Sequence, residues 1–254
     1  MIRGVGSPAP LAEHAASGRR WPTAMTRTRL LAALPDAPRW VEARALLRRP
    51  SCPLLSDGGP AFAVVEPGGL AAVVGRPGAR HVRRAADLAA EVLAVPENVA
   101  HVRAALPGWR TEWAPLHTLG GAPAPGPPHP VRLLAAGEAA RLDVPAALGE
   151  ELREADEGGA PIAAALDGGA PVAFVYPSAV SEAWWDVSVD TVATHRRRGF
   201  AWAAAVWMIA HLGGRAPVWC AVASNRASLG LAAKIGFREV DAVWLLTRPD
   251  GGPR

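Results

Sequence analysis

The chain has few of the residues that build metal clusters and disulfide frameworks. It contains only two cysteines among 254 residues. Cys52 and Cys220 lie far apart in the sequence, and two thiols make neither a disulfide framework nor a zinc site. Cys220 lies in an apolar run, where a free thiol packs as a small hydrophobic side chain. We therefore expect no metal ion and no disulfide framework.

Lysine and tyrosine are almost absent as well. Lys234 is the one lysine and Tyr176 the one tyrosine, so arginine supplies nearly all of the 27 basic residues. The formal net charge is only +4, although the sequence pI is near 10.0. Because Gly, Pro, Ala and Arg are all abundant, we interpret the arginines as the composition of a GC-rich genome. No basic stripe with interleaved aromatic residues is present, so we expect no nucleic-acid partner.

Long apolar runs are missing too. No stretch reaches the roughly 18 uncharged apolar residues that a membrane-spanning helix needs. The first 25 residues contain arginines but no continuous apolar core of a signal peptide. We expect residues 1–25 to form a flexible tail, with Met25 as an alternative start, and we expect a cytoplasmic protein without a membrane partner.

A segment rich in Pro and Gly, residues 121–130, divides the rest of the chain. Prolines fix φ and remove donors, and glycines loosen the backbone, so the composition favours a linker. Residues 26–120 before it alternate between helical and strand patterns. We expect a mixed α/β N-terminal domain there, although no motif in it indicates a chemistry.

The part after the segment, residues 131–250, predicts strands and helices in the order β-α-β-β-β-α-β-α-β. The dipeptide Gly168-Gly169 after Asp167 is a hairpin signal between two apolar runs. An Ala- and Trp-rich helix over 200–212 is expected to stop at Gly213, and a helix over 226–235 to stop at Gly236.

The most informative segment lies where a strand over 184–192 turns into the helix that begins at Phe200. A helix N-terminus carries unpaired N–H groups and about half a positive charge, so it attracts anions. Gly199 has no Cβ, which allows the turn to twist and a phosphate to approach the backbone. The three arginines before it add charge. The residues 196–201, which we call the anion turn, therefore predict a site for a pyrophosphate.

Two motifs in this region resemble the GNAT N-acetyltransferase superfamily. The spacing Arg196-x-x-Gly199-x-Ala201 is similar to the Arg/Gln-x-x-Gly-x-Gly/Ala signature of that superfamily. The later run from Asn225 through Ser228 to Phe237 resembles its second signature, Asn-x-x-Ser-x-x-Leu-Tyr-x-Lys-Leu-Gly-Phe. The resemblance covers about residues 131–250. It implies a mixed α/β sheet, a GNAT-like C-terminal domain after a smaller N-terminal one, and acetyl-CoA as the acyl donor.

The resemblance also implies which residues bind that donor. The anion turn would hold the pyrophosphate, the backbone at the end of the strand would face the pantetheine, and the start of the later helix would contact the donor near its thioester. The residues concerned are Thr191, Val192, Arg196, Arg197, Arg198, Gly199, Phe200, Ala201, Asn225 and Ser228. Asn225 also suits a helix N-cap, and the two roles are compatible.

The catalytic residues follow less directly. The sequence departs from the second signature at Ala232, where the family often has a tyrosine that protonates the leaving thiolate, so the general acid stays open. A general base must remove a proton from the acceptor amine, and a carboxylate serves for this. Alternation along 184–192 places Asp186 and Asp190 on one face, opposite an apolar face that should pack on a helix. They are our candidates, and Glu182 is the third.

We therefore expect an N-acetyltransferase that carries an acetyl or acyl group from acetyl-CoA to an amine by direct attack. The alternative is a non-catalytic acyl-CoA-binding sensor or scaffold module, which the alanine at position 232 motivates. The acceptor, a small molecule or a peptide, the acyl length, the role of the N-terminal half and the oligomeric state, including a homodimer, stay open at this point.

Overall fold

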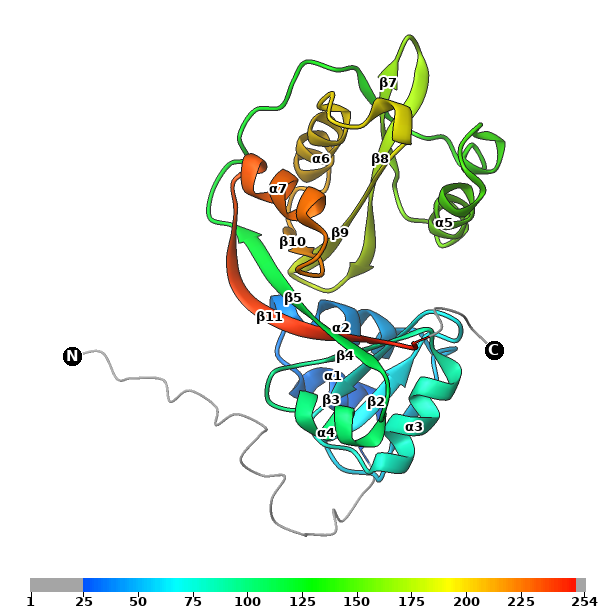
Figure 1. The fold of residues 1–254 in the computed structure, drawn as a ribbon, viewed down its shortest axis with the longest axis vertical. Helices are drawn as coiled ribbons and strands as arrows, with labels where there is room; N and C mark the ends of the chain where they lie inside the picture. The colour runs from blue at the N-terminus through cyan, green and yellow to red at the C-terminus, as the bar shows by residue number, and fades with distance from the viewer. Residues whose placement is uncertain (1–24, 250–254) are drawn as a thin grey trace, which may run out of the picture. The chain divides into compact units, whose positions relative to one another are not determined.

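The computed structural model describes residues 25–249, which fold into two compact units. Unit 1 consists of the chain up to residue 35, residues 46–112 and the chain from residue 243; unit 2 consists of residues 36–45 and 113–242. The mixed α/β fold class that the sequence predicts is confirmed (Figure 1). The expected tail 1–25 lies, apart from Met25, outside the described residues. No helix in the described part of the chain is long and apolar enough to cross a membrane.

Unit 1 is built on a mixed sheet with the strand order β1-β2-β3-β4-β11. Strands β1 to β3 form an antiparallel meander, β4 runs parallel to β3, and the end of β11 is antiparallel to β4. Helix α3 connects β3 to β4, and its face with Val82 and Ala85 packs on the sheet. The elements are α1 (Arg27–Ala33), β1 (Leu54–Ser56), β2 (Phe62–Val65), β3 (Leu70–Val74), α3 (Ala79–Leu88), β4 (Glu91–Ala94) and α4 (Val99–Ala105).

Unit 2 has the strand order β5-β10-β9-β8-β7-β6. Its strands are antiparallel except for β9 and β10, which are parallel and joined by α6. The elements are β5 (Arg110–Leu119), β6 (Val131–Leu133), α5 (Ala146–Glu157), β7 (Ala163–Asp167), β8 (Ala170–Val180), β9 (Trp184–Thr191), α6 (Phe200–His211), β10 (Ala216–Cys220), α7 (Arg226–Ile235) and β11 (Phe237–Thr247). Short 3₁₀ helices lie at Pro38–Trp40, Ala139–Arg141 and Ala193–His195, and α2 (Val41–Arg48) begins in unit 2 and ends in unit 1.

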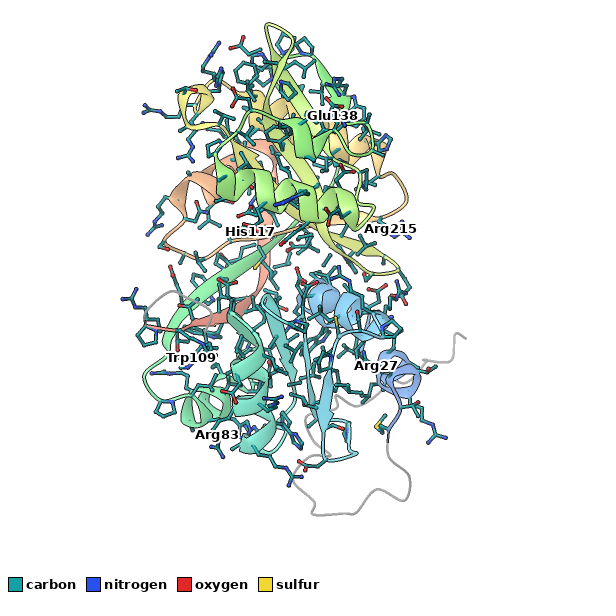
Figure 2. The ribbon with its side chains drawn as sticks, turned by 90° about the vertical axis from the view of Figure 1, so that its right-hand side faces the viewer. Arg27, Arg83, Trp109, His117, Glu138 and Arg215 are labelled. Carbon is teal, nitrogen blue, oxygen red and sulfur yellow. The ribbon has the colours of Figure 1, made fainter. Side chains whose placement is uncertain are left out.

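The core of unit 2 lies on both faces of its sheet. On one face, Trp185 and Val187 of β9 pack with Phe200 and Met208 of α6 in one buried cluster, as the alternation along β9 predicts. On the other face, α5 packs through the fully buried Leu152 in a cluster with side chains of β7 and β8. Side chains of both units are drawn in Figure 2, where Arg83 and Trp109 mark unit 1 and Glu138 and Arg215 mark unit 2.

The two units share one order of elements. Unit 1 from β1 and unit 2 from β7 each have three antiparallel strands, a helix, a strand parallel to the third, a second helix and a last strand. In both cases the last strand serves the other unit: β5 follows α4 of unit 1 but pairs with β10, and β11 follows α7 of unit 2 but its end pairs with β4. The N-terminal half thus has the same order of elements as the C-terminal half. The last strand of each half pairs with a strand of the other half.

Residues 121–130 differ from the linker that their composition predicts. The compact units divide at 112/113 and 242/243, not at this segment. The segment instead lies on unit 2: the N–H group of Ala124 donates to Ile235 O over 2.8 Å, and Trp202 Nε1 donates to Ala124 O over 3.1 Å. Prolines and glycines therefore serve here to bring the backbone close to α6 and α7.

Candidate functional site

The anion turn has the backbone that an anion site needs. Arg197 and Gly199 both have positive φ, +61° and +87°, so the chain curls just before α6 begins. Gly199 is the N-cap of α6 and no side chain caps this end. The N–H groups of Gly199, Phe200 and Ala201 donate to no acceptor within residues 25–249. Several N–H groups at the positive end of a helix thus remain available to an anion.

The arginine side chains of the turn are less available than the sequence suggests. Arg198 Nη1 lies 2.8 Å from Asp167 Oδ2, and His195 Nε2 lies 3.5 Å from the same oxygen. Arg196 Nε donates to Thr191 O over 3.3 Å. Asp167, at the end of β7, therefore contacts two side chains of this region, and no local sequence pattern predicts these contacts.

The pairing of β9 with β10 ends early. Their register runs from Trp184 opposite Ala216 to Asp186 opposite Val218, and it stops there, although β9 continues to Thr191. Beyond Asp186 this edge of β9 has no strand partner among the described residues. The parallel pair therefore separates as it approaches the anion turn, and Asp186 lies at the point of separation.

Asp186 has an unusual environment at this point. Its residue is only half-buried, but its Oδ1 is enclosed and accepts no hydrogen bond in the described structure. Ser178 Oγ donates to Oδ2 over 3.4 Å, and the carboxyl group of Glu42, at the start of α2, lies close enough to act on the pKa of Asp186. Burial, followed by the nearby charge of Glu42, raises the pKa of Asp186 well above its ordinary value. The raised pKa favours the protonated form of the Asp186 carboxyl group.

Two residues that the sequence analysis missed join this group. Glu42 belongs to a helix far away in the chain, and only the tertiary fold brings it to Asp186. Cys220 ends β10, and burial, followed by the charges of Asp186 and Glu42, raises the pKa of its thiol. A raised pKa favours the protonated thiol, so Cys220 is a neutral neighbour of the carboxyl groups.

The other two carboxylate candidates lie elsewhere. Asp190 is on the same face of β9, opposite Phe174 of β8, and burial raises its pKa while the charge of Arg196 lowers it. Glu182 precedes β9 and forms an ion pair with Arg44, whose Nη2 lies 2.7 Å from Glu182 Oε2. The structure thus brings Asp186 and Asp190 to one face of β9, whereas Glu182 is engaged by a buried arginine.

The expected contacts to the pantetheine need one correction. The N–H group of Val192 donates to Val172 O over 2.9 Å, because the hydrogen-bond ladder to β8 extends one residue beyond β9. This N–H group is therefore not open to a ligand. Thr191 O accepts from Arg196, which ties the strand end to the turn.

The start of α7 shows the structural roles of its motif. Asn225 is the N-cap and its side chain accepts from Ser228 N over 3.1 Å, while Ser228 Oγ accepts from Trp219 Nε1 over 2.9 Å. Ala232, at the position where the family often has tyrosine, is fully buried. Tyr176 is buried on β8 opposite Ser188, and burial raises its pKa. Tyr176 therefore lies on the same face of the sheet as Asp186 and Asp190.

Unit 1 has a counterpart of the anion turn between β3 and α3. There the carboxylate of Asp57 lies against the N-terminus of α3: Gly78 N donates to its Oδ2 over 3.3 Å, and a Cβ on Gly78 would lie 2.9 Å from that oxygen. His81 and Arg80 also bind Asp57, and these hydrogen bonds, that of His81 first, lower its pKa. The chain thus fills this helix end with an anion of its own.

Comparison with known proteins agrees with this geometry. A family model described as GNAT acetyltransferase matches residues 163–243, which run from β7 into β11 and include the anion turn. No curated protein matches the chain.

Solved structures extend the likeness to both units. A GCN5-related N-acetyltransferase-like protein from Streptococcus suis has a TM-score of 0.65 at 17% identity, covering 87% of this chain and 96% of that one. A GCN5-related N-acetyltransferase from Kribbella flavida has a TM-score of 0.57 at 15% identity, covering 83% and 94%. At these identities the likeness concerns the fold alone. The motif order, the turn geometry and the family match together make residues 163–243 of this chain similar to the GNAT acetyltransferase family, and the solved structures show the same fold.

Proposed function

We propose that the protein is an acyl-CoA-dependent N-acyltransferase that acetylates an amine. The observation that carries this proposal is the uncapped N-terminus of α6, whose N–H groups follow a curled turn and have no acceptor in the described structure. Each charge-assisted hydrogen bond to a diphosphate contributes about 1.5–3 kcal/mol, so a few of them support micromolar binding, which corresponds to about 8 kcal/mol. A ligand without a negative charge would not benefit from these N–H donors and the positive end of the helix.

The residues at the point where β9 and β10 separate fit the chemistry of the transfer. The acceptor nitrogen forms a bond to the acyl carbon while the carbon–sulfur bond breaks. Burial, followed by the charge of Glu42, raises the pKa of Asp186, so in this proposal one of the two carboxyl groups carries a proton while the other is ionised. The ionised member accepts the proton that the amine loses, and the protonated member gives one to the departing sulfur, so the pair ends with the proton count with which it began. This pair can supply the proton that a tyrosine often supplies in the family, where this chain has Ala232.

The side chains around Tyr176 support an amine as the acceptor. Burial raises the pKa of Tyr176, and the charges of Glu151, Asp190 and Glu154 raise it further, so three carboxylates act on this face of β8 and β9. An ammonium ion is attracted to such a face and reaches it as the ordinary protonated form of an amine at pH 7. The acceptor side is thus acidic and the donor side, at the anion turn, is basic.

The proposal is tested by binding and turnover with the wild-type chain. We expect acetyl-CoA and CoA to raise the thermal midpoint of unfolding. With acetyl-CoA and a panel of small amines and basic peptides, we expect the release of free CoA, which a thiol reagent detects. Binding without turnover of any amine would favour the sensor or scaffold alternative. No binding of CoA at millimolar concentration would refute both.

The number of sites gives a second expectation. We expect one CoA per chain by isothermal titration calorimetry, because Asp57 already occupies the corresponding helix end in unit 1 and would repel a phosphate. Two sites of similar affinity would contradict this assignment of Asp57. An Asp57→Asn variant serves as the control, since it removes the negative charge and keeps the side-chain shape. We expect one site in it too, because the side chain still occupies the end of α3.

A further inference from the structure

The Pro/Gly-rich segment 124–129, which we call the strap, lies against the anion turn. A Cβ on Gly199 would lie 2.6 Å from Pro127 Cγ, so the proline ring occupies the space beside the glycine. Gly126 also approaches α6 closely, since a Cβ there would lie 3.0 Å from Trp202 Cδ1. The absence of a side chain at Gly199 therefore serves the strap as well as the twist of the turn.

His129 makes the contact that fixes the turn. Its Nε2 lies 2.9 Å from Arg198 O, and since a carbonyl oxygen only accepts, Nε2 is the donor. The peptide bond from Arg198 to Gly199 is trans and planar, so its C=O and N–H groups point in opposite directions. By holding the carbonyl group of Arg198 on the strap side, His129 directs the N–H group of Gly199 to the opposite side, away from the strap.

The rings around Phe200 support the same orientation. The His129 ring lies on Phe200 with centroids 4.0 Å apart, and the guanidinium of Arg198 lies 5.0 Å from the centroid of the Phe200 ring. Phe200 is buried and is the first residue of α6. The histidine therefore contacts both the carbonyl group before the helix and the first side chain within it, and it joins the strap to the helix end.

We propose that His129 is a positioning residue of the acyl donor site, and that the strap presets the Gly199 N–H group toward the diphosphate before the donor binds. This inference rests on the proposed function of the anion turn. Without the histidine hydrogen bond the Arg198–Gly199 peptide is free to rotate, and the N–H group points toward the ligand in only part of the population. The affinity for CoA then falls in proportion to that part.

The test compares His129→Phe with His129→Gln by calorimetric titration with CoA. Phenylalanine keeps a ring on Phe200 but has no donor, and we expect its Kd to rise roughly three- to tenfold, which corresponds to the loss of one hydrogen bond. Glutamine supplies an N–H donor without the ring, and we expect it to recover most of the affinity. The thermal midpoint without ligand should change little in either variant.

The matched control is His211→Phe. His211 belongs to the same helix and stacks on Trp207 with centroids 4.9 Å apart, but it lies at the other end of α6. We expect its Kd for CoA to equal that of the wild type. The positioning role would be overturned, and the proposed function left standing, by either of two results. One is a wild-type Kd for CoA in His129→Phe, and the other is a loss of CoA affinity in His129→Gln as large as that in His129→Phe. If the wild-type chain did not bind CoA, the proposed function would fail first, and the role of His129 with it.

Discussion

The Asp186→Asn variant is expected to lose about 10²–10⁴-fold in turnover number while its Kd for CoA stays within about twofold. Asparagine keeps the shape of the side chain and its contact with Ser178, but it can neither accept the amine proton nor share a proton with Glu42. The measurement is the initial rate of CoA release with saturating acetyl-CoA and the best amine of the panel, together with calorimetry of CoA binding.

Asp190→Asn is the comparison that assigns the base. Asp190 lies four residues further along the same face of β9, and its pKa is raised by burial but lowered by Arg196. We expect this variant to lose less than about tenfold in turnover number. A larger loss in Asp190→Asn than in Asp186→Asn would move the general base to Asp190 and contradict the role of the carboxyl pair.

The raised pKa of Asp186 also has a consequence for stability. Because the pKa is higher in the folded than in the unfolded chain, the folded chain binds more protons at pH values between the two, and its stability falls as the pH rises through this window. Asparagine does not titrate, so Asp186→Asn should lose this part of the pH dependence and be the more stable protein above the window. Thermal unfolding of both proteins from pH 4 to pH 9 shows this separately from activity.

Gly199→Ala is expected to weaken CoA binding by more than about tenfold. A residue with a Cβ at φ +87° is strained by about 1–3 kcal/mol, and its Cβ would lie 2.6 Å from Pro127 Cγ. The strain can be relieved only if the turn or the strap moves, and either movement displaces the N–H groups at the start of α6. Calorimetry with CoA measures the effect, and the far-UV spectrum confirms that the helices remain.

Gly214→Ala separates the two causes. Gly214 also has a positive φ, +99°, and follows α6, but a Cβ there would meet no atom within 4 Å. It therefore has the backbone strain without the collision. We expect it to lower the thermal midpoint while leaving the Kd for CoA unchanged. If both variants bound CoA as the wild type does, the anion turn would not be the donor site.

The sequence predicts the parts of this fold that depend on neighbours in the chain. The strand over β9, the turn at Gly199, the helix α6 and its stop near Gly213 all follow from local patterns, and the structure has them. The face of Trp185 and Val187 was also predictable, since alternation within one strand fixes which side chains share a face.

Contacts between distant segments were not predictable in this way. Glu42 reaches Asp186, and Asp57 reaches α3, only because the tertiary fold brings separate elements together. Composition also misled at residues 121–130, because prolines and glycines that typically loosen a chain also permit close packing, as the approach of Pro127 to Gly199 shows. The same close approach explains why a glycine signature can serve packing and ligand binding at once.

The exchanged last strands make the two lobes dependent on each other. Each lobe receives a strand that the opposite half of the chain encodes, since β5 pairs with β10 and the end of β11 pairs with β4. A fragment cut between the halves would leave one sheet edge open in each piece, and open edges promote aggregation. Removal of either half is therefore expected to unfold or aggregate the other, even if only one lobe takes part in the chemistry.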